Sequence, residues 1–210
     1  MDDINYLLIL FSSFAACSSP GPATLAIAGT SMNQGRKSGL ALATGIFTGS
    51  LIWSASAAFG LAAMLHTNVW LFEIMRYFGA AYLIYLAVKS ARSAMHSSHV
   101  DLPSTKVMTS KALYIKGLLI HLTNPKAILF FGSLYSIGVP ATAEPTALLS
   151  VIGSVAMMSG SIFFGYALLF SNGVARRVYL KSKVVFESVF AIFFGAAGFK
   201  LLTSGLGKSV

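Results

Sequence analysis

The sequence predicts an all-α, polytopic membrane protein, and the prediction comes from its composition and its hydrophobic pattern. Of the 210 residues, 56% are hydrophobic and only 10% are charged, whereas a soluble domain carries about 25% charged residues. A surface with so few charges cannot face water on all sides, so we expect lipid to cover most of it. At this length the chain is expected to form a single transmembrane domain, residues 1–210.

Six apolar stretches have the length that a membrane span requires. About 20 mostly apolar residues are needed for a helix to cross the hydrocarbon core of a bilayer. The six predicted spans are residues 4–29, 39–65, 69–88, 116–137, 147–170 and 184–202.

The basic residues between these spans predict the orientation of the chain. Eleven of the fifteen Lys and Arg residues lie in the first, third and fifth connections. Cytoplasmic loops carry such an excess of positive charge, so these three loops are predicted to be cytoplasmic and both termini periplasmic. The net charge of +9 is therefore explained by the orientation of the chain in the membrane. A nucleic-acid partner is not expected, because no stacking aromatic side chains interleave the basic clusters.

The third connection is the longest and most polar, and it divides the spans into two sets of three. We predict a first half at residues 1–92, a cytoplasmic linker at 93–113 and a second half at 114–210. Because each half has an odd number of spans, the second half enters the membrane from the opposite side. The sequence thus predicts two inverted three-helix repeats, the construction of many secondary transporters.

Proline-containing breaks occur in the first span of each half. The first break is Ser19-Pro20-Gly21-Pro22, and the second is Asn124-Pro125. Proline lacks a backbone N–H and clashes with the preceding turn, so we expect both helices to be interrupted and carbonyls near residues 16–18 to lose their partners. A kink that only shapes packing is the alternative. Matched interruptions in the two halves favour a substrate site between them.

Lys126 lies beside the second break, near the predicted middle of the membrane. It follows Lys116 by ten residues, which corresponds to ~15 Å along a helix. A lysine at this depth costs ~2.5–3.5 kcal/mol on insertion scales, so we expect it to face the interior of the bundle. Two compatible roles are open: pairing with a substrate carboxylate, and capping carbonyls that the first break frees.

Three further residues are candidates for coupling or packing. His121 precedes Pro125 by one turn and is the proton-coupling candidate, because histidine titrates near neutral pH. The alternative is an ordinary packing histidine. No carboxylate is predicted at mid-membrane depth. Gly45 and Gly49 form a GxxxG pattern, which predicts close packing of the second span against another helix.

Signatures of enzymes and metal sites are missing from the sequence. It contains no HExxH, GxSxG or P-loop motif, so we expect no enzymatic activity. Cys17 is the only cysteine, and no metal or cofactor is expected. Without a nucleotide site, transport would be secondary and driven by an ion gradient.

A set of short motifs runs in order along nearly the whole chain. In the first half they are Ser19-Pro20-Gly21-Pro22, Asn33-Gln34-Gly35-Arg36-Lys37-Ser38-Gly39, Gly45-x-x-x-Gly49, Phe59-Gly60-Leu61 and Gly79-Ala80-Ala81-Tyr82-Leu83. Together they resemble the LysE/RhtB family of bacterial amino-acid exporters. In the second half, Asn124-Pro125-Lys126-Ala127-Ile128 followed by Phe131-Gly132-Ser133 resembles the threonine, homoserine and homoserine-lactone exporter branch of that family.

The resemblance implies proton-driven export of small amino acids or their derivatives across the bacterial inner membrane. The motif residues of the family correspond to these positions of the chain: Pro20, Gly21, Pro22, Gly35, Gly39, Gly45, Asn124, Pro125 and Lys126. Family members commonly have Asp or Asn directly after the Pro-Gly-Pro motif, and this chain has Ala23 there, followed by Thr24. The missing carboxylate argues against basic amino acids as cargo.

The function expected from the sequence is therefore a secondary exporter that works by alternating access on a small zwitterionic substrate. Alternatives are an exporter of another cargo, such as a metal ion or a drug, and a non-transporting membrane scaffold. Besides the substrate, membrane lipid is an expected partner, and the sequence leaves a homo-oligomer open. The expected substrate-binding residues are Ser19, Pro20, Gly21, Pro22, Thr24, Asn124, Pro125 and Lys126.

Overall fold

The computed structural model describes residues 4–67, 108–140 and 143–174, and in addition 77, 80–81, 84–85, 87–89, 91–92, 94–95, 184–185, 188–189, 191–192, 194–196 and 199. Every regular element in this described part is an α-helix, which confirms the predicted all-α class. The labelled helices are α1 (Tyr6–Ser18), α2 (Pro22–Thr67), α4 (Ser110–Leu122), α5 (Pro125–Gly138) and α6 (Pro145–Phe170).

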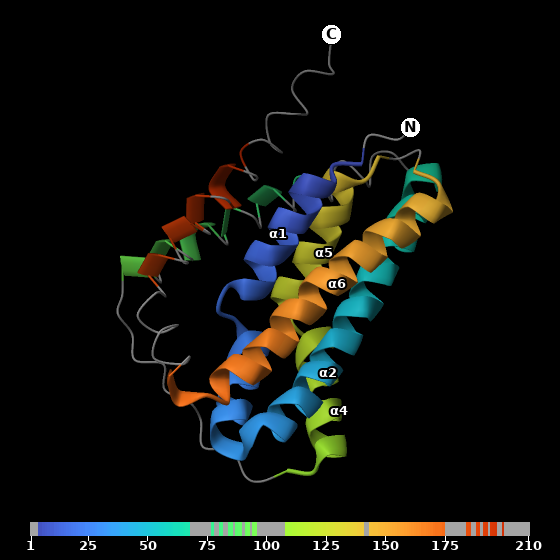
Figure 1. Ribbon diagram of the computed structural model, residues 1–210. Helices are drawn as coiled ribbons and strands as arrows, with labels where there is room; N and C mark the ends of the chain where they lie inside the picture. Colours follow the sequence, from blue (N-terminus) through green and yellow to red (C-terminus); the bar gives the residue numbers. More distant parts are fainter. Residues whose placement is uncertain are drawn as a thin grey trace.

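The first two predicted spans correspond to α1 and α2. The helix is interrupted between Ser18 and Pro22. Helix α2 then bends at Gly35, where φ is 82° and ψ is 178°. This backbone conformation is accessible essentially only to glycine. The predicted connection between the first two spans is therefore helical apart from a bend at one residue. The bend joins the end of the first predicted span to the start of the second (Figure 1).

The fourth predicted span corresponds to α4 and α5, which are separated by Thr123 and Asn124. The helix begins at Ser110, so residues 110–113, expected in the linker, are helical. The Thr109 hydroxyl caps this end by accepting the Ala112 N–H at 3.3 Å. Most of the predicted third span, about half of the predicted sixth span and most of the linker lie outside the described residues.

The two broken helices run in opposite directions. At one end of the molecule, the Asn5 N–H donates to the Gly138 carbonyl at 3.2 Å, which places the start of α1 beside the end of α5. At the other end, the Met108 N–H donates to Gln34 Oε1 at 3.2 Å, beside the Gly35 bend. This antiparallel arrangement agrees with an inverted relation between the first spans of the two halves. The complete six-span repeat remains a prediction.

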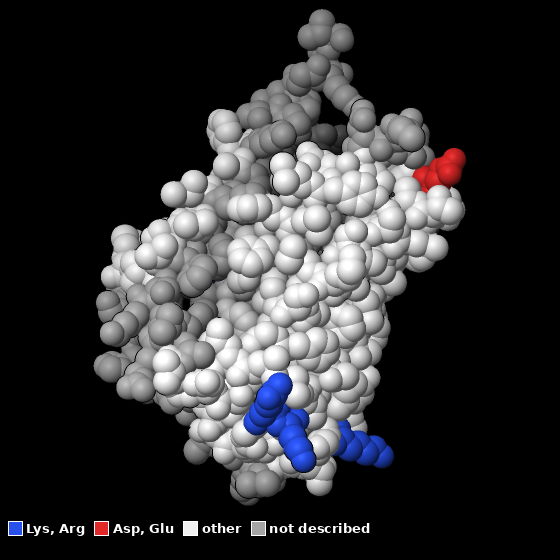
Figure 2. Space-filling model, in the orientation of Figure 1, with Lys and Arg blue, Asp and Glu red and all other residues white. Residues whose placement is uncertain are grey.

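The surface of the described helices is that of a membrane protein. Residues 22–60 of α2 and all of α6 are long and apolar enough to span a bilayer, and α1 is a shorter apolar helix. Large apolar side chains such as Leu7, Leu149 and Met157 are exposed. In the face shown in Figure 2, basic side chains gather at one end and an acidic side chain lies near the other, with an uncharged band between them.

Helices α2 and α4 pack closely at three glycines, and at two of them the neighbouring atoms are backbone atoms. A Cβ atom added to Gly45 would lie 2.0 Å from the Tyr114 carbonyl oxygen. One added to Gly117 would lie 2.2 Å from the Leu42 carbonyl oxygen, and one on Gly49 would lie 2.9 Å from the Cβ of His121. The pair Gly45 and Gly49, expected to pack against another helix, therefore faces α4. We call this contact the glycine seam, formed by Gly45, Gly49 and Gly117.

We predict that Gly45→Ala destabilises the protein by about 1–3 kcal/mol, because the added methyl group forces the two backbones apart. Thermal unfolding in detergent measures this as a lower melting temperature. Gly153→Ala on α6 is the matched control, because no atom lies within 4 Å of its added Cβ. Alanine is also the better helix former, so the control is expected to melt at or above the wild-type temperature. Equal melting of Gly45→Ala and wild type would contradict the seam.

Candidate functional site

The first break follows directly from its prolines. Ser19 is extended, with φ −73° and ψ 141°, because a residue that precedes proline is pushed away from the helical region. Pro22 is the first residue of α2, a position where its missing N–H would have no helical partner anyway. The prolines therefore end one helix and begin the next, instead of kinking a continuous one.

The second break is built in the same way. Asn124 is extended, with φ −78° and ψ 109°, and Pro125 is the first residue of α5. The Asn124 side chain caps α5, since its Oδ1 accepts the Lys126 N–H at 3.0 Å. Thr123 ends α4 by donating its N–H to the Leu119 carbonyl at 3.0 Å.

The prolines of the first break remove the helical partners of two carbonyls, and side chains replace them. Ala16 and Ser18 would normally accept hydrogen bonds from residues 20 and 22, which are both proline. Instead, the Ala16 carbonyl accepts from Ser19 Oγ at 3.3 Å. The Ser18 carbonyl accepts from the Tyr166 hydroxyl of α6 at 2.6 Å. Both carbonyls lie in the region where the sequence predicted freed carbonyls.

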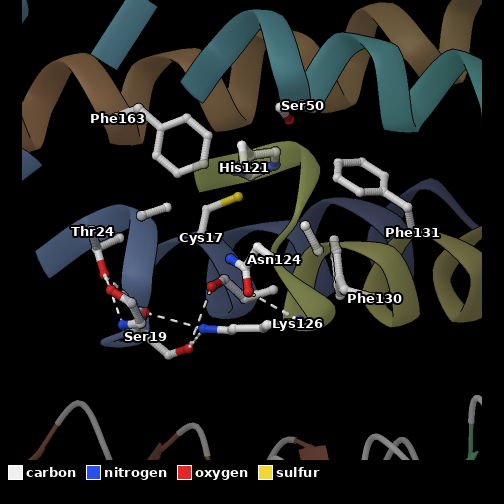
Figure 3. A pocket seen from close by; sticks show the side chains of 14 residues that line it. Cys17, Ser19, Thr24, Ser50, His121, Asn124, Lys126, Phe130, Phe131 and Phe163 are labelled. Atoms are coloured by element: carbon white, nitrogen blue, oxygen red, sulfur yellow. Dashed lines mark hydrogen bonds between the residues drawn. The ribbon is translucent and has the colours of Figure 1, made fainter. Parts of the chain in front are cut away.

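Lys126 connects the two breaks. Its Nζ donates to the Ser19 carbonyl at 3.2 Å, and it also hydrogen bonds to the Ser19 hydroxyl (Figure 3). Ser19 is buried and Lys126 is partly buried. These contacts are the ones expected if Lys126 caps carbonyls that the first break frees. They do not test whether Lys126 also binds a substrate.

A cavity of about 40 Å³ lies beside this contact, between α1, α2, α4, α5 and α6. It brings together six of the predicted candidates: Ser19, Gly21, Thr24, His121, Asn124 and Lys126. Pro20 and Pro22 do not line it, and the side chain of Pro125 lies outside the described part. Its remaining lining residues are Ala16, Cys17, Ala23, Ser50, Ala127, Phe130, Phe131 and Phe163.

The Thr24 hydroxyl stabilises the first break through hydrogen bonds to backbone groups of the break itself. Its Oγ1 accepts the Gly21 N–H at 2.9 Å, as the third helical residue does in a capping box. The same hydroxyl lies within hydrogen-bonding distance of the Gly21 carbonyl, at 3.2 Å, and of the Ser19 carbonyl, at 3.4 Å.

His121 forms part of the wall between aromatic rings. Its ring centroid lies 5.8 Å from that of Phe163 and 6.5 Å from that of Phe131, with both rings edge-on (Figure 3). The side chain is buried, and neither ring nitrogen has a hydrogen-bond partner in the described part of the chain. Its predicted role in proton coupling remains a proposal.

Several lining residues were not anticipated from the sequence. Ser50 directly follows Gly49, so the predicted packing face of α2 was the signal that could have found it. Phe163 comes from α6, where nothing in the local sequence marks it. Tyr166, which donates to the Ser18 carbonyl beside the cavity, was also not among the predicted site residues.

The electrostatics of the site come from one side-chain cation and from helix ends. Among the described lining residues Lys126 is the charged one, and none is acidic. The C-terminal ends of α1 and α4 and the N-terminal ends of α2 and α5 all lie at the breaks. Partial negative and partial positive charges therefore meet in one place. In the part of the chain that the structure describes, no group of three or more His, Cys, Asp or Glu residues could hold a metal ion.

We predict that Asn124→Ala lowers the free energy of unfolding by about 0.5–2 kcal/mol, because α5 loses its N-cap. Asn124→Ser keeps a side-chain acceptor and is expected to recover most of the loss. Denaturation in detergent, followed by circular dichroism, measures both variants. Equal stabilities of the alanine and serine variants would show that the cap contributes nothing.

The fold and site define a helical membrane protein in which two proline-interrupted helices meet at a buried cavity. The family model of the LysE type translocator matches residues 14–205, and the chain belongs to this family. This confirms the resemblance drawn from the motifs. Members of the family are translocators of the inner membrane rather than enzymes, so the chain is an inner-membrane transport protein.

Individual relatives are efflux proteins. The chain is 27% identical to the threonine efflux protein of Escherichia coli K12 over 201 residues, 95% of this chain and 98% of that protein. It is 34% identical to the leucine efflux protein of Enterobacter sp. strain 638 over 185 residues, covering 86% and 84%. It is 30% identical to the leucine efflux protein of Salmonella choleraesuis over 203 residues, 95% of each chain. No solved structure matches it.

Proposed function

We propose that this protein is a secondary transporter that exports small amino acids or their derivatives across the bacterial inner membrane, by alternating access and driven by the proton gradient. The observation that carries the proposal is the meeting of the two proline breaks at one buried cavity, where Lys126 bridges them through Ser19. The relatives named for threonine and leucine efflux support amino acids as the cargo.

The ends of the interrupted helices suit the two charges of a zwitterion. The N-terminal ends of α2 and α5 carry partial positive charge and would attract the carboxylate. The carbonyls from Cys17 to Ser19, together with the Asn124 side chain, would take the ammonium group. We assign substrate binding to the residues at the two breaks: Ser19, Pro20, Gly21, Pro22, Thr24, Asn124, Pro125 and Lys126.

The cargo is proposed to have an uncharged side chain. Phe130, Phe131 and Phe163 line the cavity, and Ala23 and Ala127 add further apolar surface. No acidic residue is present among the described lining residues to pair with a basic side chain. Threonine and leucine satisfy this condition, and lysine and arginine do not.

The small size of the cavity supports alternating access. A volume of about 40 Å³ has room for only a few water molecules, since one water needs about 10–15 Å³ of such space. An amino acid can enter only if the helices around the breaks separate. We propose that the two halves move against each other, with the basic loops in the cytoplasm and both termini in the periplasm. His121, the proton-coupling candidate predicted from the sequence, lines the cavity.

We predict that everted membrane vesicles containing the protein accumulate labelled threonine or leucine when they are energised, and that a proton uncoupler abolishes the accumulation. Everted vesicles expose the cytoplasmic face, so export is measured as uptake. Vesicles from the same strain without the protein are the control. Accumulation of lysine instead, or accumulation that persists with the uncoupler, would contradict the proposal.

The cavity itself is tested by filling it. We predict that Ala23→Leu reduces this flux at least ~tenfold, because the larger side chain occupies the space at the first break and removes room that the substrate needs. Ala81→Leu, at an exposed helical position, is the matched control and is expected to transport like wild type. Comparable size-exclusion profiles in detergent verify that both variants fold. Normal flux in Ala23→Leu would place the substrate elsewhere.

A further inference from the structure

Ser19 forms a binding place for an ammonium group. Its carbonyl accepts the Lys126 Nζ at 3.2 Å, and its hydroxyl binds the same nitrogen. Ser19 is buried, and its carbonyl is freed from helical pairing by the break. The α-ammonium of an amino acid carries the same three N–H donors on one positive nitrogen as a lysine side chain does. Two chemically equivalent groups can therefore use these acceptors.

We propose that Lys126 is a tethered competitor of the substrate: its protonated amine holds the first break closed, and the substrate ammonium takes its place on Ser19 when Lys126 gives up its proton. This inference rests on the proposed proton-driven export of amino acids. It assigns Lys126, rather than His121, as the group through which protons are exchanged for substrate.

The balance of charge explains why the proton leaves. Two ammonium groups in one small cavity repel each other, and this repulsion favours the loss of a proton from one of them. The described titratable groups that face Lys126 are Cys17 of α1 and His121 of α4 along the cavity, with Tyr166 of α6 bound to the neighbouring Ser18 carbonyl.

The exchange balances as one proton inward for each substrate outward. When the substrate enters from the cytoplasm, an N–H bond of the Lys126 ammonium breaks, its electron pair stays on Nζ, and the proton passes to cytoplasmic water. After the substrate leaves on the periplasmic side, a proton from that side restores the ammonium, which returns to Ser19. Proton and substrate are thus bound alternately, as antiport requires.

The position of the lysine chain supports the same mechanism. A Cβ atom built on Gly21 would lie 3.5 Å from both Cδ and Nζ of Lys126, so the lysine chain lies along the break itself. Displacing this chain enlarges a cavity of about 40 Å³ where the substrate has to bind. His121 has no hydrogen bond to the break in the described part of the chain, so a change in its charge would not release Ser19.

Lys126→Met tests the inference in proteoliposomes with labelled threonine and leucine. The variant keeps the length of the side chain but has no proton to exchange. We expect net efflux driven by a pH gradient to fall at least ~tenfold, and to fall further than substrate-for-substrate exchange at equal pH, because the variant cannot exchange a proton. Lys111→Met, at an exposed position near the start of α4, is the matched control and should behave like wild type.

Lys126→Arg gives the opposite expectation. A guanidinium group cannot be deprotonated in a protein, so it would hold Ser19 permanently. Both exchange and net efflux are expected to be lost. Gradient-driven efflux that is normal in either Lys126 variant would overturn the inference and leave the proposed function intact. A wild-type protein that moves neither amino acid would contradict export itself, and the inference with it.

Proton release from the wild-type protein is a second measurement, which does not depend on how a variant folds. Threonine or leucine is added to the purified protein in weakly buffered detergent containing a pH-sensitive dye. We expect about one proton to be released for each substrate bound, by linkage. Lys126→Arg, which stays charged, should release none. Binding of either amino acid to wild type without proton release would overturn the inference.

Discussion

Proline has no backbone N–H to donate, and the structure around the site depends on where this removes a hydrogen bond. Pro20 and Pro22 leave the carbonyls of Ala16 and Ser18 without helical partners. Inside a membrane such carbonyls need other donors, because no bulk water is present. The hydroxyl of Ser19 and the hydroxyl of Tyr166 supply them. The break is therefore held together by side chains from α6 and from the break itself.

The second break is held by a different set of contacts, and the two breaks stabilise each other. Asn124 caps α5 through its side chain, and this fixes the backbone of Lys126 at the first turn of that helix. From there the lysine side chain reaches Ser19 across the cavity. A residue of one half thus satisfies a carbonyl of the other half. The site exists because the two halves are incomplete on their own.

The features predicted correctly from the sequence are those that depend on neighbouring residues along the chain. The breaks followed from proline, and the family followed from ordered motifs that the comparison then confirmed. The sequence could not predict the lining residue Phe163, since only tertiary packing brings α6 to the site. The start of α4 at Ser110 was also missed, because hydropathy locates the apolar part of a helix and Thr109 caps it further out. The substrate-binding assignment remains a proposal.

The glycine seam between α2 and α4 has a mechanical consequence. Side chains that interlock between two helices resist rotation, whereas helices in backbone contact at Gly45 and Gly117 have few side chains to disengage there. This line of contact joins the first half of the chain to the second. The glycine seam would therefore act as a rotation axis. The two halves could rotate about it by a small angle without separating, while the cavity beside it changes width.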